Sequence, residues 1–257
     1  EPTYVNLTLE FLSSLSYTAV PNTASTVGTV KFRMFNKEYD LSINRMAGLL
    51  GFPYGDDVAC EAPIETEVGP FWEQLTGHTT NTYVASMIHN PAIRYFRQIL
   101  ACTIFARENS NKVNAKEFFY MQAVFAPTRI NSVPFMLSHM QAICTAKKGA
   151  ISFGGLITSI ARALELDNEL ANLEPLEPRF LNLLTVKNMH FVKARKQEGG
   201  FLLMVQKNAI EGVVLPCPDR TDVQNRANWL YDLNANPAAD PMPMDIQQNV
   251  AADGDTN

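Results

Sequence analysis

Cysteine is scarce in this sequence. The 257 residues contain four cysteines, each placed singly with no C-x-x-C pair: Cys60, Cys102, Cys144 and Cys217. A disulfide framework needs more cysteines than this, and zinc ligands normally come in close pairs, so neither is expected. Cys102 and Cys144 lie in apolar helical contexts, where a free cysteine acts as a small hydrophobic residue. The sequence therefore predicts buried, reduced thiols and a reducing, intracellular compartment.

Long apolar runs are also missing. No stretch approaches the roughly 18 apolar residues that a membrane-spanning helix needs, so no membrane partner is expected. The N-terminus lacks the basic start and apolar segment of a secretory signal, and it lacks an initiator methionine. We interpret Glu1 as a cut within a longer chain.

The sequence has no excess of positive charge. Five aspartates and no Lys, Arg or Glu occur in residues 232–257, namely Asp232, Asp240, Asp245, Asp253 and Asp255. Removing them leaves 21 basic and 26 − 5 = 21 acidic residues, so the body is neutral. We predict one folded domain over residues 1–231 and a disordered acidic tail over residues 232–257. A neutral body disfavours tight nonspecific binding of nucleic acid, but it does not exclude binding through a local basic patch.

Recognisable catalytic motifs are absent. The four histidines are dispersed (His78, His89, His139 and His190), and no phosphate-binding glycine loop or Gly-x-Ser-x-Gly motif occurs. The string Tyr54-Gly-Asp-Asp57, which polymerases use to bind metals, follows a helix stop here and is interpreted as a turn. We expect no enzyme activity, no cofactor, no metal and no small-molecule ligand. A hydrolase or nuclease site assembled from distant acids stays an alternative.

One basic cluster is present within KNMHFVKARK, and its members are Lys187, Lys193, Arg195 and Lys196. These side chains are candidates for weak contacts to nucleic-acid phosphates, or for a weak nuclear signal. The same residues are also typical of the solvated face of an edge strand, where lysine discourages unwanted strand pairing. The sequence leaves both interpretations open.

Hydrophobic periodicity predicts a mainly helical α+β fold. Residues 30–35 alternate apolar and polar side chains, and with residues 38–41 they predict a short N-terminal β-hairpin. Ser42 is expected to cap a helix over residues 43–50 that Gly51 ends. Residues 200–216 predict a second hairpin.

Four further helices are expected after residue 86. Asn90-Pro91 and the pair Asn114 with Glu117 are typical helix starts, and Ser132 and Gly154-Gly155 precede two more apolar stripes. Because short loops join these segments, the pattern predicts an antiparallel helical bundle.

Several phrases resemble plant retrotransposon proteins of the Athila type, encoded by the first reading frame. They are FRMFNKEYDLSINRMAGLLGFP at 32–53, FWEQLTG at 71–77, MIHNPAIRYFRQILACTIFARENSNKVNAKEFFYM at 87–121 and KKGAISFGGLITSIARAL at 147–164. The order of elements is also similar, more remotely, to the plant mobile domain and to putative plant transposon domains. The resemblance implies a plant source and a nuclear or cytoplasmic setting, with the nucleus favoured. It supplies no catalytic residues.

The favoured hypothesis is therefore a noncatalytic retrotransposon-encoded interaction or assembly module that acts with copies of itself, RNA or DNA. Besides the cryptic hydrolase or nuclease, a host-domesticated nuclear factor associated with chromatin remains an alternative.

Overall fold

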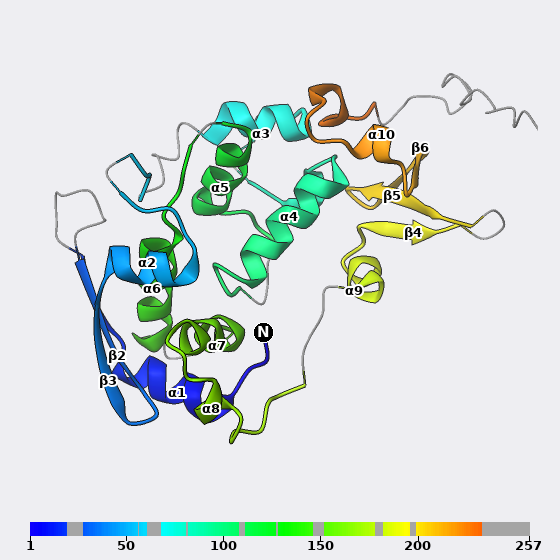
Figure 1. The fold of residues 1–257 in the computed structure, drawn as a ribbon. Coiled ribbons are helices and arrows are strands. Elements are labelled where there is room, and N and C mark those ends of the chain that lie inside the picture. Colours follow the sequence, from blue (N-terminus) through cyan, green and yellow to red (C-terminus); the bar gives the residue numbers. More distant parts are fainter. Residues whose placement is uncertain are drawn as a thin grey trace, which may run out of the picture.

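The computed structural model describes residues 1–19, 28–55, 57–60, 68–80, 82–107, 111–126, 128–145, 152–177, 182–195 and 199–232. The α-helices are α1 (Val5–Ser14), α2 (Ile43–Leu50), α3 (Val68–Thr76), α4 (Pro91–Cys102), α5 (Ala115–Phe125), α6 (Ser132–Thr145), α7 (Gly154–Ala163), α8 (Asp167–Leu170), α9 (Leu183–Asn188) and α10 (Pro218–Thr221). The strands are β1 (Ser16–Ala19), β2 (Gly28–Met34), β3 (Lys37–Ser42), β4 (Val192–Ala194), β5 (Phe201–Val205) and β6 (Asn208–Leu215). Two 3-10 turns are η2 (Ala85–Met87) and η3 (Arg226–Asn228). The strands form two antiparallel three-stranded sheets, β1-β2-β3 and β4-β5-β6, which lie at opposite ends of the molecule (Figure 1).

The N-terminal sheet contains the predicted hairpin. β2 and β3 pair from Thr29–Ser42 to Met34–Lys37, and Phe35 and Asn36 form the turn with φ values of 52° and 60°. The carboxylate of Glu10 on α1 fixes this turn by accepting hydrogen bonds from the backbone N–H of Phe35 (2.9 Å) and of Asn36 (2.8 Å). The hairpin is thus confirmed, and a helix placed before it in the chain stabilises it.

A first hydrophobic core lies between this sheet and its covering helices. Phe32 stacks between Phe11 of α1 (4.8 Å between centroids) and Tyr39 of β3 (5.3 Å). α2, α6 and α7 complete the enclosure (Figure 1), with Met46, Met136 and Ile157 fully buried in the same cluster.

A second core is rich in aromatic side chains and joins α3, α4 and α5. Trp72 is fully buried, and its ring packs edge-on against Tyr83 (5.3 Å) and Phe118 (5.2 Å). α6 belongs to both cores, because Phe135 faces the aromatic cluster while Met136 and Leu137 face the first core.

Three predicted helix starts are confirmed. The side chain of Ser42 accepts a hydrogen bond from the N–H of Arg45, and Asn90 does the same for Ala92 and Ile93. Asn114 and Glu117 form a complete capping box at α5.

Glu117 also carries a buried ion pair. Its side chain is 0% exposed and accepts from Arg97 Nε at 2.9 Å and from Arg97 Nη2 at 2.8 Å, while Arg107 binds the other carboxylate oxygen. Burial lowers the pKa of the Arg97 guanidinium, and the adjacent Glu117 carboxylate offsets part of that effect. This cluster ties α4, α5 and the connection between them together.

The predicted second hairpin is confirmed as β5 and β6, and β4 adds a third strand. Leu203, Val205, Ile210 and Val213 form a small core with Tyr231. Arg94 of α4 connects this sheet to the helices. Its guanidinium donates to the carbonyls of Met204 (2.6 Å) and His190 (2.9 Å) and lies 3.9 Å over the Phe191 ring.

The predicted antiparallel helical bundle is wrong. The described helices pack on two sheets or around the aromatic core, which gives a mixed α+β fold. Periodicity predicted where the helices lie along the chain, but it carries no information on whether a sheet or another helix covers an apolar face. Residues 233–257, most of the predicted acidic tail, lie outside the described residues, and the single-domain assignment stays a prediction.

The four cysteines are free thiols, as expected, but their predicted burial is wrong. Cys144 is exposed and the other three are partly exposed. Burial raises the pKa of the Cys102 thiol, which lies 2.9 Å from Gln98 Nε2.

Candidate functional site

The structure distributes the predicted basic cluster over the edge of the C-terminal sheet. Lys187 lies in the last turn of α9, Lys193 is exposed at the centre of β4, and Arg195 follows that strand. Lys196 lies outside the described residues.

These cations do not share one surface. Lys193 pairs with Leu202, and Ala194 pairs with Phe201. Directly opposed residues of antiparallel strands share a face, so Lys193 and Phe201 lie on opposite faces. The Lys187 ammonium lies 5.0 Å over the Phe201 ring, on the side away from Lys193. The described residues of the predicted cluster, Lys187, Lys193 and Arg195, therefore lie around the edge strand β4, and we call them the basic rim.

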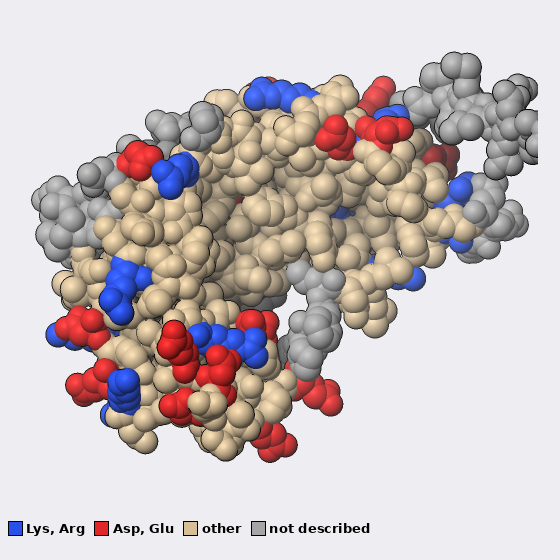
Figure 2. Space-filling model, in the orientation of Figure 1, with Lys and Arg blue, Asp and Glu red and all other residues tan. Residues whose placement is uncertain are grey.

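The rim is still a local excess of positive charge. Residues 182–217 contain five Lys or Arg and two Glu. Lys187, Lys193 and Lys207 have no ion-pair partner among the described residues, whereas Lys31 pairs with Asp40 and Arg129 pairs with Asp57 in the preceding part of the chain. In Figure 2 basic and acidic side chains intermingle over α1, α7 and α8, while the coloured side chains along α9 and β4 are basic.

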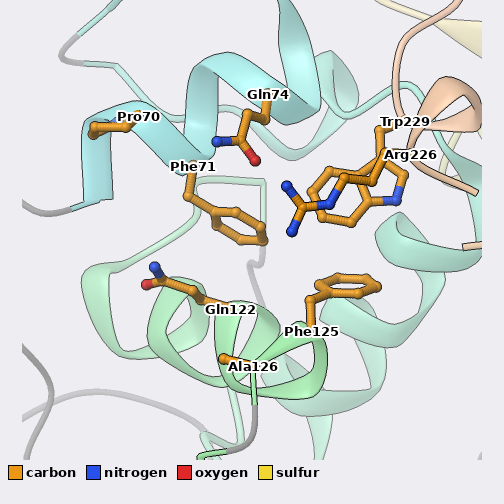
Figure 3. Close-up of a pocket in the computed structure, with 8 residues that line it drawn as sticks. All are labelled: Pro70, Phe71, Gln74, Gln122, Phe125, Ala126, Arg226 and Trp229. Carbon is orange, nitrogen blue, oxygen red and sulfur yellow. The ribbon is translucent and has the colours of Figure 1, made fainter. Parts of the chain in front are cut away.

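A pocket lies beside this sheet, where α3, α5 and η3 meet (Figure 3). Its volume is about 210 Å³. α3 contributes Pro70, Phe71 and Gln74; α5 and its C-cap contribute Gln122, Phe125 and Ala126; the C-terminal segment contributes Arg226 and Trp229.

Aromatic rings form the floor of the pocket. Trp229 packs against Phe125 (4.5 Å between centroids) and edge-on against Phe71 (5.9 Å, 88°). The indole Nε1 donates to the carbonyl of Val223 at 2.8 Å, which fixes the ring. The Arg226 guanidinium lies 5.2 Å over the Trp229 ring, at the mouth of the pocket.

Hydrogen bonds hold the C-terminal segment against α4. Asn90, the N-cap of α4, donates through Nδ2 to the carbonyl of Asn228 at 3.0 Å. Asn228 in turn donates to the carbonyls of Asp219 (2.7 Å) and Asp222 (3.0 Å). The backbone N–H of Tyr231 donates to Nδ1 of the buried His89 at 3.0 Å. The C-terminal segment, which forms one wall of the pocket, is therefore held in place by hydrogen bonds to the start of α4.

Residues 1–127 match the ATHILA ORF-1 family. This match confirms the resemblance to an Athila-type retrotransposon protein over these residues. No curated protein and no solved structure gives a significant match.

The ATHILA ORF-1 match covers only part of the site. It includes α3 and α5, which form two walls of the pocket, but it ends before Arg226, Trp229 and the basic rim. Of the resembling phrases, those at 32–53, 71–77 and 87–121 lie within the match, and the phrase at 147–164 lies beyond it.

Sequence reasoning missed the pocket, because its walls come from three distant stretches, 70–74, 122–126 and 226–229. The one available signal is Arg226 and Trp229 at a spacing of three.

The other candidate catalytic or metal-binding side chains do not cluster in the described part of the chain. Within the described ranges there is no group of three or more His, Cys, Asp or Glu that could hold a metal ion. Asp57 of the Tyr54–Asp57 string forms an exposed ion pair with Arg129 at 2.9 Å, and Asp56 lies outside the described residues. Over the same part of the chain, no helix is long and apolar enough to cross a membrane.

Proposed function

We propose that this Athila-type protein is a noncatalytic module of its retroelement that binds single-stranded nucleic acid and packages it together with further copies of itself. The observation that carries the proposal is the basic rim of the C-terminal sheet, where Lys187 and Lys193 lie without an ion-pair partner among the described residues, together with Lys207 in the turn between β5 and β6. Exposed lysines without an ion pair attract phosphates without any need for a specific sequence.

The neutral body sets the expected strength of binding. A rim of a few lysines neutralises a few phosphates, and each contact to a single strand contributes about 0.7 to the slope of log K against log salt. Binding should therefore be weak at physiological ionic strength and clear at low salt. Several copies on one strand would multiply such weak contacts, which suits a packaging role.

Light scattering after size exclusion at low salt tests the proposal, with and without a labelled single-stranded RNA of about 12 nucleotides. A shift in the mass of the complex is expected. A monomer that leaves the RNA free would contradict the proposal. Time-dependent cleavage of the RNA in the presence of Mg²⁺ would favour the hydrolase or nuclease alternative.

The rim itself is tested by changing Lys187, Lys193 and Lys207 together to alanine. If all three contact phosphates, the salt slope falls by about 2. The matched control replaces Lys37, Lys112 and Lys116, three exposed lysines of the family-matched half, and alters the net charge equally. An equal loss of binding in both triple variants would show that overall charge, and not the rim, attracts the strand.

A further inference from the structure

The pocket formed by α3, α5 and η3 holds polar groups that the fold leaves unused. Arg226 is exposed, and its guanidinium has no ion-pair partner in the described part of the chain. The amides of Gln74 and Gln122 are exposed on opposite walls and have no hydrogen-bond partner among those same residues. Among the described residues, no acidic side chain lines the pocket.

The shape of the pocket suits one flat ring system. Its volume of about 210 Å³ is that of roughly seven water molecules at liquid density, enough for a planar ring system. Phe125 and the Arg226 guanidinium, which lies over the buried Trp229 ring, provide planar surfaces. A heterocycle can stack on such planes with little dependence on its identity.

The side-chain amides of Gln74 and Gln122 can form hydrogen bonds with the edge of such a ring. Each glutamine amide offers a carbonyl acceptor beside N–H donors, and nucleobase edges carry neighbouring donors and acceptors in the complementary pattern. A peptide could also use these amides, but the exposed Arg226 guanidinium over the Trp229 ring favours a ligand that is planar and attached to an anionic backbone.

The pocket is linked along the chain to the C-terminal sheet. Trp229 belongs to the aromatic cluster at the pocket, and two residues later Tyr231 packs into the core of the C-terminal sheet. Residues 229–231 therefore run from the pocket to the sheet that carries the lysines.

We propose that this pocket receives one unpaired nucleobase of a single-stranded nucleic acid, with Phe125 and the Arg226–Trp229 pair as stacking surfaces and Gln74 and Gln122 as contacts to the base edge. The inference rests on the proposed function and deepens it. The rim attracts the phosphates, and the pocket distinguishes a strand with accessible bases from a duplex.

The decisive comparison uses two strands of equal length, a base-containing strand of about 12 nucleotides and an abasic strand with the same phosphates. The base-containing strand should bind about tenfold more tightly. It should also quench the fluorescence of Trp229, which is only 3% exposed but lines the pocket, whereas Trp72, the other tryptophan, does not line it. Running the comparison in ribose and deoxyribose forms identifies which strand the pocket prefers.

Gln74→Ala, Gln122→Ala and Arg226→Ala should each reduce the preference for the base-containing strand while leaving abasic binding nearly unchanged. All three side chains are exposed, so the fold should tolerate their loss. Gln224→Ala and Arg45→Ala are the matched controls, since both are exposed and neither lines the pocket.

Equal binding of both strands would overturn the inference and leave the proposed function standing. Binding of neither strand would remove both. Displacement of the base-containing strand by a proline-rich peptide, without any quenching by the nucleobase, would show that the pocket is a peptide site and would also overturn the inference.

Discussion

Glu117 has two structural roles, one in its own helix and one in tertiary packing. Its carboxylate completes the capping box of α5 and pairs with Arg97 and Arg107 at 0% side-chain exposure. The capping role follows from the spacing of Asn114 and Glu117 and was predicted. The ion pair was not, because nothing in the spacing shows that Arg97, which is 20 positions away, reaches the same carboxylate.

Replacing Glu117 with glutamine should destabilise the protein by about 3–5 kcal/mol, because the Arg97 guanidinium would remain buried without a compensating charge. Urea denaturation measures the effect. Asp40→Asn is the matched control, since it removes an equivalent charge from the exposed Lys31–Asp40 pair (64% and 56% exposed) and should cost less than about 1 kcal/mol. Similar losses in both variants would mean that burial does not set the strength of these pairs.

At the level of elements, local sequence signals predicted where helices begin, but they did not predict which elements pack against one another. Ser42, Asn90 and Asn114 begin helices as predicted, because capping depends on neighbouring residues only. The helical bundle failed as a prediction, because an apolar helix face fits equally well against a sheet, and α1 covers β2 in this way. The pocket depends even more on tertiary structure, since three segments far apart in the sequence must meet to form it.

The contact between α1 and the first hairpin allows an element-level test. Glu10→Gln removes the charge that accepts the N–H groups of Phe35 and Asn36, and it should cost about 1–3 kcal/mol. Hydrogen exchange should show faster exchange at both turn amides. Glu73→Gln, at an exposed position of α3, should leave them unchanged. Unaltered exchange in Glu10→Gln would show that the turn is stable without the helix.

Across the whole molecule, one side chain fastens the C-terminal sheet to the helical part. Arg94 is 1% exposed, burial lowers its pKa to about 9, and its two donors bind carbonyls 96 and 110 positions away in sequence. Sequence patterns gave no sign of this role, because an arginine in α4 is compatible with a solvated helix face.

Arg94→Lys should loosen the sheet even though it retains a charged side chain, because an ammonium lacks the planar fork that binds both carbonyls and stacks on Phe191. Amides of β5 should then exchange faster, while those of β2 keep their protection. Arg45→Lys, at an exposed site, is the control. A uniform loss of protection in both sheets would mean that Arg94 supports the whole fold and not this junction alone.

The position of α6 bears on how such a chain can be divided or recombined. The family match ends at residue 127, and α6, which begins at Ser132, supplies Met136 and Leu137 to one core and Phe135 to the other. A fragment cut at the end of the match would open both cores to water, because α1 would lose α6 and α7, and Tyr120 would lose the Phe135 ring against which it packs. The family boundary is therefore not a folding boundary, and a recombination event that exchanged the segment after residue 127 would have to bring a replacement for α6 with it.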